Sequence, residues 1–303
     1  MKVNKNIIVG ICIITFFVFY LLLINNTNSY AKKKSIEATY VGSETCKECH
    51  EDTFNKFKST IHGRIADFEA KGQVLGCEAC HGPGSVHVEE QDPEKIVSLK
   101  KLTPQESSKI CLNCHREEPQ IAWPSSTHAL SGISCTDCHD PHQTRGKFLL
   151  KSKDPKLCFQ CHREKIASMN YPSHHPIKEK KMKCSSCHDT HGTFRANLRA
   201  ETINELCFSC HAEKQGPFTY EHAPVVENCL LCHDSHGTIA NNLLKQNQPF
   251  LCMQCHPGHE DHYHPAVTNP EWRISFYTKC TQCHSQIHGS DFPSLSGHGR
   301  FTR

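Results

Sequence analysis

Apolar residues are concentrated in one stretch, residues 7–24, and the rest of the chain shows no alternating strand pattern. Segments rich in proline, glycine and lysine, such as 171–183 and 256–269, predict loops and turns. Short helices are predicted where cysteine pairs and a following histidine cluster, because these residues fit within little more than one helical turn. The pattern therefore predicts a mostly α chain with little regular secondary structure.

The N-terminal apolar run has the features of an export signal. Lys2 and Lys5 precede it, and Ser29 and Ala31 supply small residues at the spacing of a signal peptidase site. Residues 1–31 are therefore predicted to be a cleaved signal peptide and residues 32–303 the mature domain. The run is also long enough to span a bilayer, so an uncleaved anchor and membrane association through this segment are the alternative. In both cases the domain lies outside the cytoplasm, and we predict a periplasmic protein.

Ten copies of Cys-x-x-Cys-His run through the chain and use 20 of its 21 cysteines. The cysteines are Cys46, Cys49, Cys77, Cys80, Cys111, Cys114, Cys135, Cys138, Cys158, Cys161, Cys184, Cys187, Cys207, Cys210, Cys229, Cys232, Cys252, Cys255, Cys280 and Cys283. The motif histidines are His50, His81, His115, His139, His162, His188, His211, His233, His256 and His284.

Each motif predicts one covalently bound haem c, giving ten in all. The two thiols bond to the porphyrin and the histidine ligates its iron from one side. Neither a disulfide framework nor a zinc ribbon needs a histidine after every cysteine pair. The leftover Cys12 lies inside the apolar run and is interpreted as a small buried hydrophobic residue.

The motifs form a repeat of haem pairs. Five units of two motifs span residues 46–87, 111–142, 158–191, 207–236 and 252–288, and the middle three end alike in CHDPH, CHDTH and CHDSH. With roughly 27 residues for each haem the chain cannot build an ordinary aliphatic core. We therefore predict an elongated multihaem cytochrome c of five two-haem repeats, whose core is supplied by the haems and whose folding requires them.

Fourteen of the 24 histidines lie outside the motifs and are candidates for the second axial position. The predicted distal ligands are His62, His87, His128, His142, His174, His191, His222, His236, His264 and His288. His174 is preferred to His175 because His174-His175-Pro176 aligns with His222-Ala223-Pro224, and His259 and His262 remain alternatives to His264. A histidine three residues after a motif histidine projects from the same side of the turn, so it should ligate a neighbouring haem.

Other residues near the motifs are assigned simpler roles. Asp140, Asp189 and Asp234 each follow a motif histidine and are predicted to cap a turn. Methionine, the ligand that raises haem potentials, is scarce: Met169 and Met182 have histidine competitors, and Met253 lies between two motif cysteines. Bis-histidine coordination is therefore predicted throughout.

Six-coordinate iron leaves no open position for a substrate, so we predict electron transfer, no catalytic residues and no enzyme activity. The formal charge of +3 gives no indication of a nucleic-acid partner, because haem propionates are not counted in it. Two alternatives stay open. A multihaem reductase of nitrogen or sulfur oxyanions would need one free iron face, and a subunit of an extracellular cytochrome filament would share a histidine with the next copy.

The paired motifs, their total, the segment FTYEHAPVVENCLLC at 218–232, CHDSHGT at 232–238 and the export signal together resemble the periplasmic decahaem cytochromes of the MtrA/DmsE type. The resemblance covers nearly all of the mature chain. It implies a nearly linear haem wire that carries electrons from an inner-membrane or periplasmic donor to the outer membrane, with an outer-membrane barrel and an extracellular cytochrome or terminal acceptor as partners. The long apolar run and the histidine-rich segment 256–264 depart from the expected pattern and bear on the barrel partnership.

Overall fold

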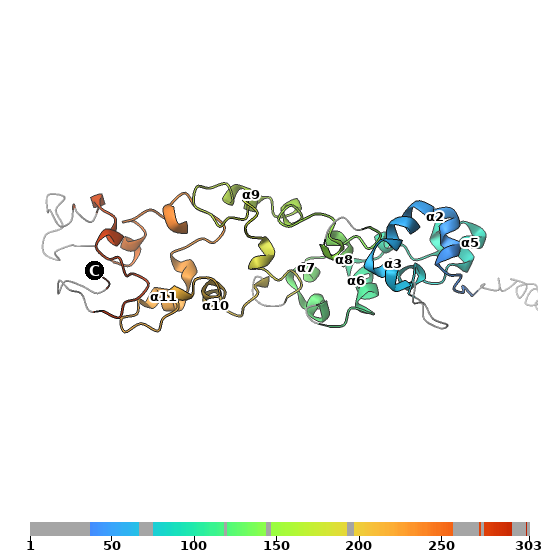
Figure 1. Ribbon diagram of the computed structural model, residues 1–303, viewed down its shortest axis with the longest axis horizontal. Coiled ribbons are helices and arrows are strands. Elements are labelled where there is room, and N and C mark those ends of the chain that lie inside the picture. Colours follow the sequence, from blue (N-terminus) through green and yellow to red (C-terminus); the bar gives the residue numbers. More distant parts are fainter. Residues whose placement is uncertain are drawn as a thin grey trace, which may run out of the picture.

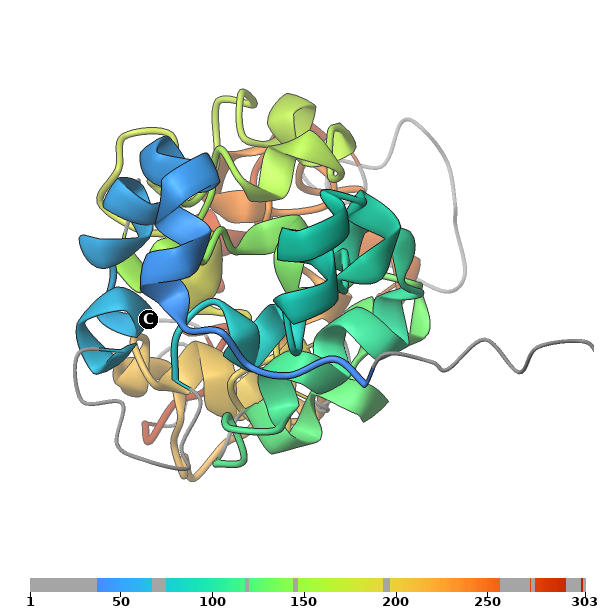
Figure 2. The same cartoon turned by 90° about the vertical axis from the view of Figure 1, so that its right-hand side faces the viewer.

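The computed structural model describes residues 37–66, 75–117, 120–143, 147–192, 197–256, 273, 276–292 and 301. The predicted signal peptide and His264 lie outside these residues. The described chain forms a long, narrow rod and progresses along it in sequence order, from helices α2 (Ser43–Lys58) and α5 (Ser85–Glu90) at one end to α11 (Ala223–Glu227) near the other (Figure 1). Seen along its axis the rod has a rounded outline (Figure 2).

The secondary structure is short and helical, as the sequence predicts. The remaining α-helices are α3 (Ile61–Ala66), α4 (Glu78–His81), α6 (Pro104–Leu112), α7 (Thr127–Leu130), α8 (Cys135–Cys138), α9 (Glu164–Ser168) and α10 (Ile203–Phe208). Between them lie the 3-10 turns η1 (Pro93–Lys95), η2 (Leu99–Lys101), η3 (Gln120–Ser125), η4 (Lys147–Leu149), η5 (Cys158–Gln160), η6 (Cys184–Ser186), η8 (Ala212–Lys214), η9 (Cys229–Leu231), η10 (Asn241–Leu243), η11 (Cys252–Gln254) and η12 (Cys280–Gln282).

The haem-binding motifs lie on these short turns. In motif after motif the histidine N–H donates to the carbonyl of the first cysteine, for example His162 to Cys158 at 3.0 Å and His284 to Cys280 at 2.8 Å. This spacing of four residues places the first cysteine and the histidine on one side of the turn. In α2 the helix is kinked at the motif histidine itself, since His50 has φ −113° and ψ 37°.

A hairpin-like loop follows the second motif of each of the three middle units. Asp140 Oδ1 accepts a hydrogen bond from the N–H of His142 at 3.1 Å, and Asp189 and Asp234 do the same for His191 and His236. The prediction that these aspartates cap turns is therefore confirmed. Each of the three loops is closed by one isolated β-bridge, which pairs His139 with Leu150, His188 with Leu198 or His233 with Leu244. Pairing within the described ranges does not extend beyond such bridges.

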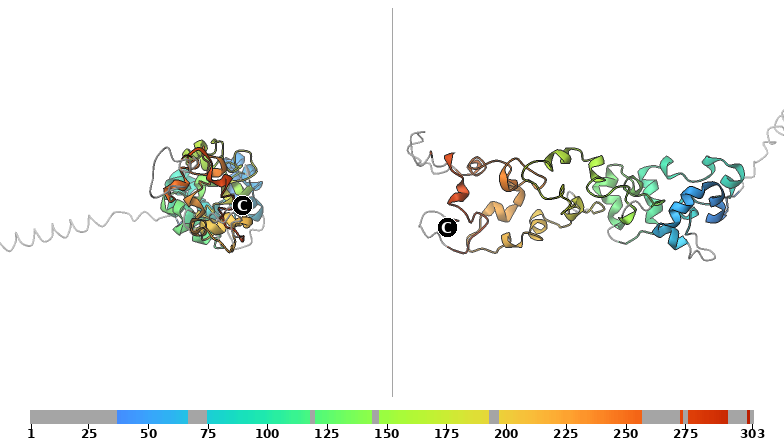
Figure 3. Two further views of the ribbon diagram at one scale, coloured as in Figure 1. Left: turned by 90° about the vertical axis from the view of Figure 1, so that its left-hand side faces the viewer. Right: turned by 45° about the horizontal axis from the view of Figure 1, so that its top comes forward.

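The described chain buries few hydrophobic side chains. They are Phe54, Phe57, Val86, Trp123, Ala129, Met169, Ile177 and Ala240, which are spread over the sequence from residue 54 to residue 240. The ribbon follows the rod in sequence order in the views of Figure 3 as well, so residues this far apart in the sequence do not gather in one core. Such a sparse aliphatic set cannot offset the conformational entropy of a chain of this length. Over the ranges described, no helix combines the length and the apolar character needed to cross a bilayer.

Candidate haem sites

Sites 1 to 10 denote the ten motifs in chain order, and units 1 to 5 the predicted pairs. Nine motif histidines each face a second histidine from outside the motifs. The pairs, with the distances between ring centroids, are His50–His87 6.2 Å, His81–His142 6.0 Å, His115–His62 5.9 Å, His139–His191 6.0 Å, His162–His128 6.2 Å, His188–His236 6.1 Å, His211–His175 6.4 Å, His233–His288 6.1 Å and His256–His222 6.0 Å.

This spacing fits an iron atom held between two imidazoles. Metal–imidazole bonds of about 2 Å on both sides, with the distance from each nitrogen to its ring centre added, give roughly 6 Å. None of the twenty motif cysteines, all of which are among the described residues, forms a disulfide, so each is available for a bond to porphyrin. The donor set therefore fits a haem c at each of the ten motifs, and at nine of them a second imidazole faces the motif histidine at the spacing that bis-histidine ligation requires.

Burial keeps several of these imidazoles in the neutral form that binds metals. Burial is the first cause that lowers the pKa of His142, His191 and His236, followed by the positive form of a neighbouring histidine or lysine. The same cause lowers the pKa of His62, His222, His233 and His288. A neutral imidazole keeps a lone pair for the iron.

Backbone carbonyls select which ring nitrogen is free. The Nδ1 atom of His139 lies 2.8 Å from the carbonyl oxygen of Phe148, and that of His81 lies 2.7 Å from that of Val97. Further Nδ1 contacts of this kind are His87 with Asp92, His128 with Thr190, His175 with Ser235 and His233 with Asn242. An Nδ1–H that donates to a carbonyl fixes the tautomer, leaves Nε2 for the metal and raises the basicity of the ligand.

In unit 3 the structure places His175, not His174, opposite His211. Both ring nitrogens of His174 are engaged elsewhere, Nδ1 with the carbonyl of Tyr171 and Nε2 with Glu179 at 3.1 Å. His175 keeps its Nε2 free because only its Nδ1 contacts a carbonyl, that of Ser235 at 2.8 Å. This placement favours His175 over the predicted His174.

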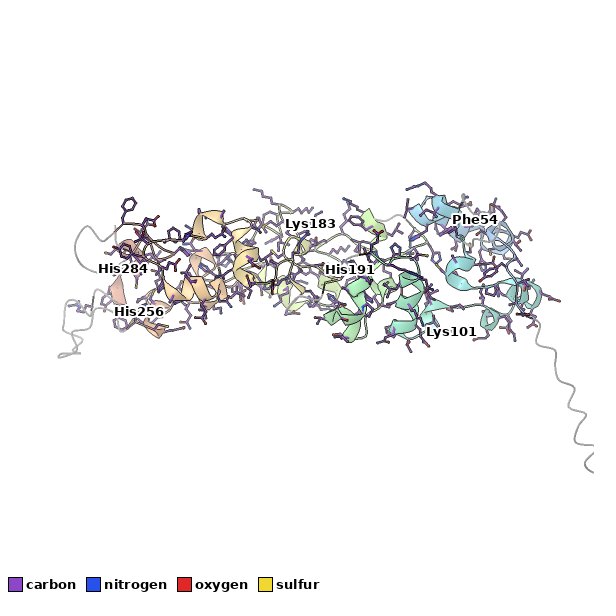
Figure 4. All side chains as sticks on the ribbon, turned by 90° about the horizontal axis from the view of Figure 1, so that it is seen from below. Phe54, Lys101, Lys183, His191, His256 and His284 are labelled. Atoms are coloured by element: carbon purple, nitrogen blue, oxygen red, sulfur yellow. The ribbon has the colours of Figure 1, made fainter. Side chains whose placement is uncertain are left out.

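Adjacent units exchange histidines in both directions. The histidine between the two motifs of one unit faces the first site of the next unit, as His62 faces His115 and His128 faces His162. The histidine that ends a unit faces the second site of the previous unit, as His191 faces His139. Figure 4 shows His191 near the middle of the rod, well away from His256 and His284 at the C-terminal end.

Unit 1 closes on itself. His87, which ends this unit, faces His50 in the same unit rather than a site further on. At the other end of the chain, His284 of site 10 is described but its predicted partner His264 is not, and His259 and His262 also lie outside the described residues. The distal ligand of site 10 stays a prediction.

Short backbone bridges hold the exchanged histidines in register. Ser173 pairs with Thr238, and Tyr220 pairs with Ser290. Each bridge residue lies two positions from an exchanged histidine: Ser173 precedes His175, and Thr238 follows His236. Tyr220 stands in the same relation to His222, so the bridges align His175 with His222. In the structure His222 therefore corresponds to His175, one residue from the position that the sequence alignment gives.

Two glycines let these bridges approach closely. Gly237 has φ +141° and Gly289 has φ +143°, values that residues with a side chain rarely adopt. A Cβ atom on Gly237 would lie 2.1 Å from the carbonyl oxygen of Ser168, and one on Gly289 would lie 2.1 Å from Cδ2 of Phe218. Both glycines directly follow an exchanged histidine, so they bring His236 and His288 against the neighbouring unit.

The motif cysteines form a continuous row along the rod. Within unit 1, burial and then the neighbouring Cys77 thiol raise the pKa of Cys46 to about 11. The first cysteines of the two motifs are neighbours in the same way in units 2 to 5, as Cys111–Cys135, Cys158–Cys184, Cys207–Cys229 and Cys252–Cys280. Once bonded to haem these sulfurs do not titrate, but the first cysteines of the two motifs in each unit still lie near each other.

The second cysteines connect one unit to the next. Burial and then the Cys114 thiol raise the pKa of Cys80, which links sites 2 and 3. Equivalent links are Cys138–Cys161, Cys187–Cys210 and Cys232–Cys255. First cysteines within units and second cysteines between units therefore alternate, and the sites follow one another from 1 to 10 in chain order.

Comparison with known proteins agrees with this geometry. The family described as "Doubled CXXCH motif" matches residues 128–167, 174–216 and 222–261. Each matched span begins at or beside a histidine between motifs and joins the second motif of one unit to the first of the next. The chain is thus a multihaem c-type cytochrome, with covalently bound haem c, that transfers electrons.

A named relative narrows this assignment. The "Multiheme cytochrome MtrA" of Shewanella baltica (strain OS185) is 37% identical over 277 residues, which cover 86% of this chain and 83% of that protein. The chain belongs to the MtrA family of multihaem cytochromes. The predicted fold class, cofactor and family resemblance are confirmed.

Proposed function

We propose that the chain relays electrons through ten bis-histidine haems in chain order, from a periplasmic donor towards the outer membrane or an extracellular acceptor. The motif cysteines attach the haems, and the motif histidines ligate the iron on one face. The distal ligands are His62, His87, His128, His142, His175, His191, His222, His236 and His288, with one of His259, His262 and His264 completing site 10.

The observation that carries this proposal is the alternating row of cysteine neighbours. Electrostatic interactions between neighbouring thiols, within units and between units, follow one another without a break from Cys46 to Cys280. Because each sulfur is an attachment point for porphyrin, consecutive attachment points lie side by side along the rod. Such an arrangement favours hopping between neighbours over any use of a single isolated centre.

The residues of the chain fix the ligation and tune it. Bound haem c supplies a one-electron couple of its iron. Carbonyls at Nδ1 orient the imidazoles and fix their tautomer, and low-potential couples are expected of imidazole pairs without methionine. With a histidine on both faces at the nine described pairs, no face is open to a substrate. We therefore propose that the chain is not an enzyme.

The location and the partners are part of the same proposal. The N-terminal charges, apolar run and small-residue site support export to the periplasm, with association through the apolar run if it is not cleaved. The elongated shape of the described chain, with the sites arranged along it, supports a relay between partners at its two ends (Figure 1). We propose an inner-membrane or periplasmic electron donor and, on the acceptor side, an outer-membrane barrel with or without an extracellular cytochrome.

Spectroscopy of the purified holoprotein tests this function. We expect ten haems by mass, low-spin ferric signals throughout, and no carbon monoxide adduct after reduction under native conditions. A high-spin signal from one haem would instead support a reductase, and a mass that grows with concentration would support a filament. Fractionation of cells, followed by co-purification of an outer-membrane barrel with the cytochrome, tests the location and the partner. Recovery with the inner membrane would show that the apolar run is retained as an anchor, whereas absence of an outer-membrane barrel from the purified cytochrome would contradict the proposed partner.

A further inference from the structure

A polar side chain just before the first motif of each unit holds the start of the second motif. Ser43 Oγ accepts from the N–H of Cys77 at 3.0 Å, and Ser108 Oγ accepts from that of Cys135 at 3.3 Å. Asn204 Oδ1 accepts from Cys229 N–H at 2.8 Å.

Units 3 and 5 follow the same scheme from a position one residue earlier. Asp154 accepts from the N–H groups of Cys184 and Ser185, both at 2.9 Å. Gln248 Oε1 accepts from the N–H and the hydroxyl of Thr281, both at 3.1 Å, directly after the first cysteine of the second motif. We call Ser43, Ser108, Asp154, Asn204 and Gln248 the clasp residues.

The five units share this hydrogen bond but not the type of residue that accepts it. The clasp residues stand three or four positions before the first cysteine of their unit, and they include two serines, an aspartate, an asparagine and a glutamine. Their shared property is an oxygen that accepts a backbone N–H across more than 20 residues, since the separations are 34, 27, 30, 25 and 33. A sequence search by residue identity therefore does not detect them.

The bond does two things at once. It satisfies an N–H at the start of a helical turn, where no intrahelical partner exists. It also holds the start of the second motif beside the residues that precede the first motif. The first cysteines of the two motifs are neighbours there, as Cys158 and Cys184 are in unit 3.

We propose that the clasp residues are positioning residues that set the spacing between the two haems of each unit, and that the carboxylate of Asp154 also lowers the potential of the pair in unit 3. This inference rests on the proposed haem relay and specifies which residues hold its pairs.

The charge of Asp154 distinguishes unit 3 from the other four. Burial opposes its ionisation, but the hydrogen bonds from Ser185 and Cys184 outweigh burial and hold the pKa of this carboxyl below its usual range. A fixed negative charge stabilises the oxidised, more positive iron and so lowers its potential. The clasp residues of units 1, 2, 4 and 5 are uncharged.

The test compares holoprotein variants that separate bond from charge. Asp154→Asn keeps one of the two acceptor oxygens, as Asn204 supplies one in unit 4, and removes the charge. Asp154→Ala removes both. Gln248→Glu adds a charge to the clasp of unit 5 without changing its shape. Glu179→Gln is the control, because it removes an exposed carboxylate from unit 3 that accepts from His174 and not from a motif.

Three measurements are made on each variant: haem count by mass, a redox titration followed in the visible spectrum, and electron paramagnetic resonance of the oxidised protein. For Asp154→Asn we expect ten low-spin haems, an upward shift confined to about two of the ten, and unchanged magnetic interaction between haems. For Asp154→Ala we expect the same shift together with weakened interaction within one pair. Gln248→Glu should shift about two haems downward, and Glu179→Gln should match the parent.

The outcome that contradicts the role of the clasp residues differs from the outcome that contradicts the proposed electron relay. If Asp154→Ala retains ten haems and matches the parent in titration and magnetic interaction, the clasp does not position the pair. If the unsubstituted protein carries fewer than ten haems or contains high-spin iron, the proposed set of haem ligands is wrong, and that result contradicts the relay and not the clasp residues.

Discussion

The imidazoles of His81 in unit 1 and His142 in unit 2 face each other with ring centroids 6.0 Å apart and ring planes 16° apart. The two residues belong to different units, so an iron held at site 2 as we propose would join segments that no described strand or long helix connects. The proposed ligation would then supply the contacts between units that hold the chain in its fold. Substitutions at distal histidines should therefore report on single sites with defined neighbours.

Replacing His142 with methionine should raise the potential of one haem. A thioether is a weaker donor to ferric iron than imidazole, so the reduced form is favoured by on the order of 0.1 V. Protein-film voltammetry should show one couple displaced upward, with the helical circular dichroism of the parent retained. His174→Met is the matched control and should leave every couple in place. Absence of any displaced couple in the His142 variant would show that this residue is not a ligand.

The choice between His175 and His174 can be decided by ligand binding. Removing the imidazole of His175 should open the iron at His211, so that about one haem in ten binds carbon monoxide after reduction. His174→Ala removes a side chain that contacts Tyr171 and Glu179 and should bind none. If carbon monoxide bound to the His174 variant instead, the alignment of the sequence would be right and the structural placement wrong.

A side chain at Gly237 should displace His236 from site 6. Alanine there requires an unfavourable backbone conformation and a contact with the Ser168 carbonyl, at a cost of about 1–3 kcal/mol. We expect partial high-spin character at one haem, measured by paramagnetic resonance, along with lower thermal stability. Gly192→Ala is the control: it also follows a distal histidine, but its Cβ would meet only the Asp189 side chain at 3.1 Å or more. Equal effects of the two substitutions would rule out a specific role for Gly237.

Glu78 should anchor the N-terminal end of the rod. Its side chain is buried, and its carboxylate accepts hydrogen bonds from the N–H groups of Val41, Gly42 and Gly84. Glu78→Ala leaves these buried donors unpaired and should lower the free energy of unfolding by about 3 kcal/mol. Denaturant titration followed at the Soret band measures the loss. Glu89→Ala, at an exposed position in α5, should change the free energy of unfolding by less than about 0.5 kcal/mol.

Chain prepared without haem should not fold. The buried hydrophobic side chains of the described residues are few and dispersed, so the porphyrins must supply most of the apolar contact. Export without the cytochrome maturation machinery should yield protein with a disordered circular dichroism spectrum and rapid proteolysis, whereas the matured protein resists both. A protease-resistant, helical apoprotein would contradict this account of the core.

The sequence predicts the chemistry more completely than the connections. Motif spacing alone gives the attachment residues, the helical turns that carry them and the aspartate-capped loops, because each depends on neighbours along the chain. The pairing of distal histidines with sites depends on contacts between units, and spacing within a unit cannot supply it.

His175 illustrates the limit. Two adjacent histidines satisfy the same local pattern, and the choice between them is made by the bridge of Ser173 with Thr238, more than 60 residues away along the chain. The clasp residues escape prediction for a related reason. A backbone N–H can donate to almost any side-chain oxygen, so the hydrogen bond can be kept while the residue that accepts it changes.

The reciprocal exchange of histidines also constrains how such a chain can change its length. Excising a whole middle unit would leave the flanking units to ligate each other, since each contributes one imidazole forward and one backward. Unit 1 cannot be excised or repeated in this way, because its last histidine, His87, faces His50 in the same unit and so is not available to a preceding unit. We therefore expect the number of haems in such chains to vary in steps of two, through loss or gain of middle units, while the first and last units are kept.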